Sequence, residues 1–262
     1  MTTATASHTE TTIEIAGKSI RLMQAGSGSP ALFLHHSTGS PGWQPIHDHL
    51  AQHFALTVPD VPGYGQSERP EWAREPRDIA ILLNRALDKL GFQGVTLIGA
   101  GLGGFIAAEM AVMNQSRLAK LVLIGAAGLQ PETGEIVDQM LIDFPDYLKA
   151  NFRDDGAYEQ AFGADAASEF KQLWDFSREM TARITWKPYM FSRRLAPVLG
   201  EIEVPALVIW GAEDRVIPVA CADQYVAALG NARLEIVPGA GHAVEMEEAE
   251  KVANLIRTHA AS

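Results

Sequence analysis

Short apolar runs alternate along this chain with segments whose apolar residues follow helical spacing. The runs are typical of strands and lie at residues 12–15, 20–23, 31–35, 55–58, 95–99, 118–124, 206–210 and 234–237. From Ala31 onward they are nearly continuously apolar, as parallel strands are when helices bury both faces of a sheet. The first two runs suggest an antiparallel edge. The alternation therefore predicts an α/β protein with a mostly parallel, eight-stranded sheet.

Five segments are predicted to be the helices that flank this sheet: 44–52, 77–90, 102–113, 219–228 and 245–258. Between Ile124 and Val204 the alternation stops, and the segment is rich in aromatic, Met, Asp and Arg residues without a convincing strand. We interpret 130–199 as an inserted helical cap and 1–129 with 200–262 as one core domain. A single domain with an insertion is ordinary for 262 residues.

Composition excludes several classes of protein. The formal charge of −11 would repel nucleic acid and anionic membranes. Cys221 is the only cysteine, so it can form neither an intrachain disulfide nor a thiolate cluster, and we expect it to be a packing residue in a cytoplasmic protein. The first ten residues have no targeting pattern and are predicted to be a disordered lead-in.

The strand predicted at 95–99 runs into the sequence Gly-Ala-Gly-Leu-Gly-Gly at 99–104 and then into a helix. This is the spacing of G-x-S-x-G, in which the central residue sits on a strained strand-to-helix turn and presents a nucleophile. The central residue here is Gly101, which has no side chain. The reactive site of an open parallel sheet lies beyond the carboxyl ends of its strands, so this turn is the first candidate.

Two further strand ends carry an acid and a base. Asp214 follows the strand at 206–210, and His242 follows the strand at 234–237 within a Gly-rich loop. A carboxylate can hold an imidazole in the tautomer that accepts a proton, so the two residues are candidates for a catalytic pair. Asp214 has an alternative interpretation as a turn residue that pairs with Arg215.

The strand at 31–35 ends in the polar turn His-His-Ser-Thr-Gly-Ser. The backbone amide of Ser37 is a candidate oxyanion donor, together with the amide of Leu102 at the start of the helix. His35 and His36 lack a third ligand at useful spacing, so no metal site is predicted. We expect His36 to line the substrate pocket. In the predicted cap, Trp174, Trp186 and Tyr189 are candidates for contact with an apolar substrate.

These features in this order resemble the α/β-hydrolase fold over nearly the whole chain. The segment Pro-Asp-Val-Pro-Gly-Tyr-Gly-Gln-Ser at 59–67 is similar to the family's loop after its fourth strand. The position of the cap and the segment Trp-Lys-Pro-Tyr at 186–189 resemble the meta-cleavage-product hydrolases, which cleave C–C bonds, and small esterases. The resemblance implies a cofactor-free hydrolase with a Ser-His-Asp triad.

The chain departs from that family at two positions. Gly101 stands where the family has its nucleophilic serine, and His36 stands where the family usually has glycine. Without a serine, covalent acyl transfer at position 101 is excluded. We therefore expect His242, oriented by Asp214, to act as a general base on a water held in the space beside Gly101. The expected substrate is a small apolar carbonyl compound such as an ester, a lactone or a vinylogous diketone.

The sequence leaves other interpretations open. Gly101 is either natural or an engineered replacement of serine in an ordinary hydrolase. The same dyad would also serve a lyase or an isomerase, and a ligand-binding protein of this fold would keep the pocket without the chemistry. We expect no cofactor, no nucleic-acid or membrane partner, and a monomer or homodimer.

Overall fold

A computed structural model describes residues 8–163 and 166–262. Its centre is one sheet with the strand order β1-β2-β4-β3-β5-β6-β7-β8, in which β1, β2 and β4 pair antiparallel and every pairing from β4 onward is parallel. The strands are β1 (Thr9–Ile15), β2 (Lys18–Ala25), β3 (Ser29–Leu34), β4 (Phe54–Pro59), β5 (Val95–Ala100), β6 (Leu118–Ile124), β7 (Ala206–Gly211) and β8 (Ala232–Val237). The predicted α/β class and the antiparallel edge are confirmed.

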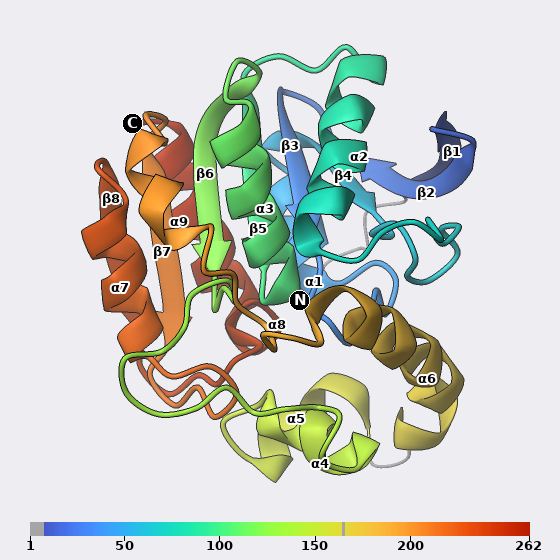
Figure 1. The fold of residues 1–262 in the computed structure, drawn as a ribbon, viewed down its shortest axis with the longest axis vertical. Coiled ribbons are helices and arrows are strands. Elements are labelled where there is room, and N and C mark those ends of the chain that lie inside the picture. Colours follow the sequence, from blue (N-terminus) through green and yellow to red (C-terminus); the bar gives the residue numbers. More distant parts are fainter. Residues whose placement is uncertain (1–7, 164–165) are drawn as a thin grey trace.

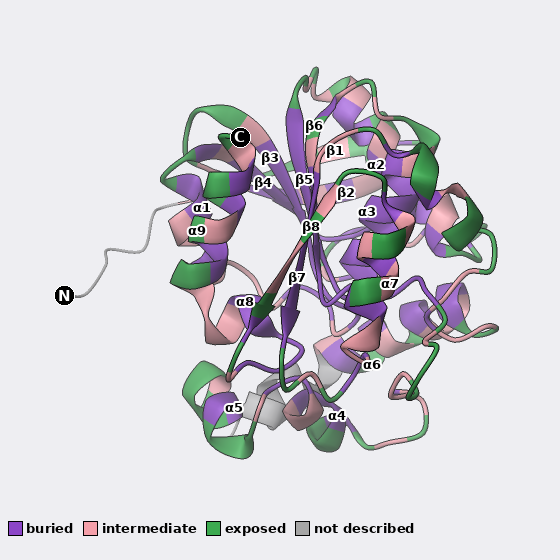
Figure 2. Cartoon of the chain, turned by 90° about the vertical axis from the view of Figure 1, so that its left-hand side faces the viewer, coloured by how far each residue is buried: buried purple, intermediate pink, exposed green. Residues whose placement is uncertain are grey.

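Helices cover both faces of the sheet. Seen edge-on, α1 and α9 lie on one side, and α2, α3 and α7 lie on the other (Figure 2). The helices are α1 (Pro45–Ala51), α2 (Pro76–Lys89), α3 (Leu102–Met113), α4 (Phe144–Ala150), α5 (Asp155–Phe162), α6 (Ala166–Thr185), the 3₁₀ helix η1 (Ala196–Glu201), α7 (Ala220–Ala228), α8 (Val244–Glu247) and α9 (Ala249–Ala260). Two large apolar clusters, one on each face, form the core.

The segment between β6 and β7 contains α4, α5 and α6, and its described residues contribute no strand to the sheet. These helices lie beyond one end of the sheet rather than against its faces (Figure 1). A smaller apolar cluster that includes Phe144, Phe152 and Trp174 joins α4 and α6. This arrangement is compatible with the cap and core division at 130–199, which remains our interpretation.

Two sequence predictions are wrong in detail. The final helix, expected as one element over 245–258, is two helices, because Glu248 leaves helical geometry at φ −128° and ψ 46°. The second concerns the expected disordered lead-in. Residues 1–7 lie outside the described residues, but His8 stacks on Trp43 with ring centroids 4.8 Å apart, and Thr9 already begins β1.

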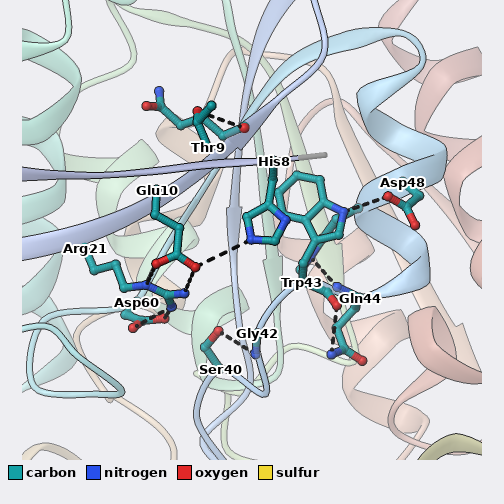
Figure 3. A network of polar contacts seen from close by, with 12 residues as sticks. His8, Thr9, Glu10, Arg21, Ser40, Gly42, Trp43, Gln44, Asp48 and Asp60 are labelled. Carbon is teal, nitrogen blue, oxygen red and sulfur yellow. Dashed lines mark hydrogen bonds and ion pairs between the residues drawn. The ribbon is translucent and has the colours of Figure 1, made fainter. Parts of the chain in front are cut away.

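Ion pairs hold this edge of the sheet in place. Glu10 lies between His8 and the guanidinium of Arg21, which also reaches the buried carboxylate of Asp60 (Figure 3). The Nη2 of Arg21 lies 2.5 Å from Glu10 Oε1, and its Nη1 lies 3.2 Å from Asp60 Oδ2. Ion pairs, rather than burial of apolar side chains, hold Glu10 and Arg21 in place. The order of these residues therefore could not be predicted from the hydrophobic pattern.

His47 of α1 gives the stability of the fold a pH dependence. Burial, followed by the nearby His35, lowers the pKa of His47 from 6.5 to about 3. As the pH falls below 6.5, the unfolded chain takes up a proton on His47 and the folded chain does not, so stability falls. From pH 7 to pH 5 the loss should be about 2 kcal/mol.

Urea titrations at the two pH values measure this term. Each titration compares the chain with His47→Gln, which cannot take up the proton. The variant should lose about 2 kcal/mol less than the unchanged chain between pH 7 and pH 5. Equal losses in the two proteins would contradict the assignment.

Candidate active site

The four turns singled out in the sequence meet at one edge of the sheet. Residues 35–40 follow β3, Gly101 follows β5, Asp214 lies just past β7 and His242 lies past β8. In the sheet order β3 neighbours β5 and β7 neighbours β8, with β6 between the two pairs. All five strands are parallel, so their carboxyl ends point the same way, toward α4, α5 and α6 (Figure 1). The fold thus brings the predicted turns together.

Gly101 forms a sharp turn between β5 and α3. Its φ of 55° and ψ of −116° are a conformation that side chains rarely adopt. Gly99 and Gly103 let α3 approach the strands closely, because a Cβ on Gly103 would overlap the carbonyl oxygen of Leu34. The turn therefore points the α-carbon of Gly101 into the space between His36 and His242.

His242 and Asp214 form a buried hydrogen-bonded pair. The Nδ1 of His242 lies 2.8 Å from Asp214 Oδ2, and both side chains are almost fully buried. The other carboxylate oxygen, Oδ1, accepts the backbone N–H groups of Val216 and Ile217 at 2.8 and 2.9 Å. Asp214 is thus held from two sides, and with Nδ1–H donating to it, His242 presents Nε2 as the proton-accepting atom.

The alternative pairing of Asp214 with Arg215 is absent from the described residues. Arg215 donates instead to the backbone carbonyls of Lys149 and Phe152, near the end of α4. Among the described residues, His242 is therefore the ionisable side chain that the Asp214 carboxylate contacts.

His36 lies where a side chain on Gly101 would project. A Cβ built on Gly101 would overlap Nδ1 of His36 and would lie 3.3 Å from Nε2 of His242. The two rings are edge to face, with centroids 4.9 Å apart and an interplanar angle of 66°. The expectation that the space beside Gly101 holds a water is therefore wrong in part, because the imidazole of His36 fills some of it.

The sequence analysis missed the partner of His36. Its Nε2 lies 2.9 Å from Oε1 of Glu245 on α8, and both side chains are buried. A carboxylate in the apolar stretch Ala-Val-Glu-Met, directly after His242, was the available signal. The prediction of one helix over 245–258 did not reveal this partner, because it placed Glu245 at the first position of that helix and assigned it no contact.

His35, in contrast, is fully engaged in structural contacts. Its Nδ1–H donates to the carbonyl of His36 at 2.7 Å, and its Nε2 accepts the N–H of Val61 at 3.0 Å. Burial lowers its pKa, which keeps it neutral and suits this pattern of one donor and one acceptor. His35 thereby fastens the turn that carries His36 to the loop after β4.

The backbone amides of Ser37 and Leu102, the predicted oxyanion donors, belong to the turn after β3 and to the start of α3. Within residues 8–163 and 166–262, no hydrogen bond from either N–H is found. The hydroxyl of Ser37 lies 3.2 Å from Oη of Tyr147, and its carbonyl accepts the hydroxyl of Thr181. Burial raises the pKa of Tyr147 to about 12, so the phenol stays protonated.

Two small cavities lie near the turn after β3. A cavity of about 30 Å³ is lined by residues of the β3 turn and of α4, α5, α6 and α8: Thr38, Gly39, Pro41, Phe144, Leu148, Phe162, Leu173, Trp174 and Met246. A neighbouring cavity of about 20 Å³ reaches His36 and Glu245. Trp174 lines the larger of the two cavities, so a ligand that enters that cavity would be in van der Waals contact with it.

Trp186 and Tyr189 line neither of these two cavities. Trp186 is 66% exposed and lines a separate groove of about 740 Å³ with basic residues that include Arg77, Arg183 and Arg194. The hydroxyl of Tyr189 accepts the N–H of Gln139, and burial together with the nearby Tyr147 raises its pKa. Substrate contact by these two residues remains a prediction.

Comparison with known proteins identifies the family of this chain. A family model described as the alpha/beta hydrolase family matches residues 31–255, most of the chain. The chain belongs to the alpha/beta hydrolase family. The expected fold class is thus confirmed both by this match and by the topology of the sheet.

Individual relatives of this hydrolase have similar lengths. This chain is 27% identical to the 2-hydroxymuconate semialdehyde hydrolase of Pseudomonas sp. strain CF600, and the match covers 92% of this chain and 90% of the relative. It is 24% identical to the 2-hydroxy-6-oxo-6-phenylhexa-2,4-dienoate hydrolase of Comamonas testosteroni, over 88% and 87%. The solved structure of the corresponding Rhodococcus hydrolase shares its fold, with a TM-score of 0.79 at 18% identity, covering 98% of this chain and all of that one. These similarities to hydrolases support assigning this chain as a hydrolase.

The described residues contain neither a candidate metal-binding cluster nor a candidate membrane-spanning helix. No three His, Cys, Asp or Glu side chains in them are arranged to hold a metal ion. In the same part of the chain, every helix is too short or too polar to cross a bilayer. Burial raises the pKa of the Cys221 thiol to about 12, so this residue is a poor nucleophile.

Proposed function

We propose that this hydrolase cleaves a small, largely apolar carbonyl compound with water, using a His242–Asp214 pair in place of a serine nucleophile. The hydrogen bond of 2.8 Å between His242 and the twice-anchored Asp214, next to the Gly101 turn, carries the proposal. It fixes which imidazole nitrogen is free to accept a proton. The named C–C hydrolases among the relatives support a carbonyl substrate.

In the proposed reaction, Nε2 of His242 takes a proton from water as the oxygen attacks the carbonyl carbon. The backbone amides of Ser37 and Leu102 are suited to stabilise the oxyanion, because neither N–H has an acceptor in the part of the chain that the structure describes. The tetrahedral intermediate then collapses, and the bond to the leaving group breaks. The chain's own residues supply every group for this sequence, so it requires no cofactor.

The substrate is expected to be apolar and modest in size. The cavities beside His36 and Trp174 have volumes of only about 20 and 30 Å³, so an acyl group that binds in either one must displace side chains that line it. Their lining of Phe144, Leu148, Trp174 and Met246 favours an apolar acyl group. Cleavage of an ester, a lactone or a C–C bond beside a carbonyl is compatible with these features.

Turnover of a defined panel tests the proposal. The panel contains short-chain nitrophenyl and alkyl esters, a γ-lactone and a vinylogous 1,5-diketone. The unchanged chain should hydrolyse at least one compound at a rate proportional to enzyme concentration. A chain that binds these compounds without converting any of them would be a binding protein, and the proposal would be wrong.

The variant Gly101→Ser should not gain activity over the unchanged chain. The new Cβ would overlap the imidazole of His36, and φ of 55° adds backbone strain, so stability should fall by about 1 to 3 kcal/mol. Adding His36→Gly should recover part of this loss, which a urea titration measures as coupling between the two sites. A large gain in activity from Gly101→Ser alone would instead identify a serine hydrolase that had been disabled.

A further inference from the structure

Gly101 and His36 are sterically complementary. The imidazole occupies the space into which any side chain at position 101 would project, and a Cβ there would overlap its Nδ1 atom. The ring is almost fully buried, so it is not a surface histidine that happens to lie nearby. His36 can therefore reach the centre of the site only because residue 101 is a glycine.

The two nitrogens of His36 are in different environments. Nε2 is hydrogen-bonded to Glu245 Oε1 at 2.9 Å, whereas Nδ1 is buried and has no hydrogen-bond partner among the described residues. An unpartnered polar atom in a protein interior costs stability, so it calls for an explanation. The explanation offered by the geometry is a ligand atom, because Nδ1 lies beside the position that a Cβ of Gly101 would take, as Nε2 of His242 does.

His36 repeats the arrangement of His242. Each imidazole has one nitrogen on a buried carboxylate, Glu245 for His36 and Asp214 for His242. The remaining nitrogens, Nδ1 of His36 and Nε2 of His242, both lie close to the point where a Cβ of residue 101 would be. Two imidazoles, each oriented by its own carboxylate, thus face one reaction space.

We propose that His36 is a second catalytic residue: with both ring nitrogens protonated and Nε2–H held by Glu245, it donates the proton on Nδ1 to the leaving group. This inference rests on the proposed function. His242 Nε2 takes the proton of the attacking water. The bond from the carbonyl carbon to the leaving oxygen then breaks, and the oxygen keeps the electron pair and receives the proton of His36. A new water carries the proton from His242 back to His36, so the cycle of ester and water to acid and alcohol is balanced.

This pairing defines a substrate class. A general base alone suffices when the leaving group is weakly basic, as a nitrophenolate is. An alkoxide is strongly basic and must be protonated as it leaves, so a positioned acid accelerates its departure. With His36 as that acid, the enzyme is suited to esters or lactones of ordinary aliphatic alcohols as well as to activated esters.

The test compares an ethyl ester and a nitrophenyl ester of the same short acyl group. His36→Gln keeps a polar side chain of similar size but cannot transfer a proton. Its kcat/KM for the ethyl ester should fall by about 10² to 10³-fold, and for the nitrophenyl ester by less than about tenfold. The matched variant His242→Gln should lower both by similar factors. Glu245→Gln should follow His36→Gln with a smaller loss, because it only positions the ring.

Equal losses on the two esters in a folded His36→Gln protein would overturn the role of His36 and leave that of His242 intact. If the unchanged chain hydrolyses neither ester nor any other panel compound, both proposals are wrong. A second variant guards against misfolding. His36→Gly leaves a space of the size of the ring, and added imidazole should raise its hydrolysis of the ethyl ester at least about tenfold. Absence of rescue in the folded variant would count against proton transfer by His36.

Discussion

Replacing His242 by alanine should lower kcat/KM by about 10³ to 10⁴-fold on every substrate that the chain converts. The imidazole is the proposed acceptor of the proton from water. It is also the group that the hydrogen bond to Asp214 orients for this role. Activity assays with the panel compounds measure the loss. A residual rate from the amides of Ser37 and Leu102 should remain.

Asp214→Asn is the matched control for this result. The asparagine keeps the size of the side chain, but its amide favours the wrong tautomer of His242, so the loss should be similar. Thermal unfolding of both variants shows whether the fold is kept. Activity within tenfold of the unchanged chain in folded His242→Ala would exclude His242 as the base.

The largest effect on stability is expected for Gly211→Ala, at least about 3 kcal/mol. Gly211 ends β7, just before the turn that carries Asp214. A Cβ at this position would overlap the carbonyl oxygens of Ala240 and Gly241 in the loop that carries His242. These are backbone atoms, so relief requires the two catalytic loops to move apart.

Gly230→Ala is the control, because no atom lies within 4 Å of a Cβ built there. Urea unfolding should show a change of under about 0.5 kcal/mol for this variant. Similar stabilities of the two variants would mean that the β7 and β8 loops are not packed as described. A folded fraction of Gly211→Ala should also have lower activity, since its His242 and Asp214 would be displaced.

The sheet was predictable because its strands are nearly continuous apolar runs. The run at 118–124 was placed without error as β6, and the helix at 102–113 coincides with α3. Periodicity reports burial, and in these segments burial determines the structure. The order of the site turns followed from the rule that parallel strands share a carboxyl edge.

Contacts between polar groups that are far apart in the sequence could not be predicted from hydrophobic periodicity. Nothing local to His36 or Glu245 indicates that they meet, since 209 positions separate them and the pairing depends on the break after α8. The order at His8 and Glu10 depends likewise on Trp43 and Arg21. The steric relation between Gly101 and His36 required coordinates, although both departures from the family pattern were visible in the sequence.

The central claim is that this hydrolase works without a covalent acyl-enzyme. The most direct measurement is intact mass spectrometry of the chain, quenched during steady turnover of its best ester substrate. The account predicts product formation with the mass of the protein unchanged and no burst equivalent to the enzyme. A stoichiometric acyl adduct that forms and decays at the rate of turnover would contradict it.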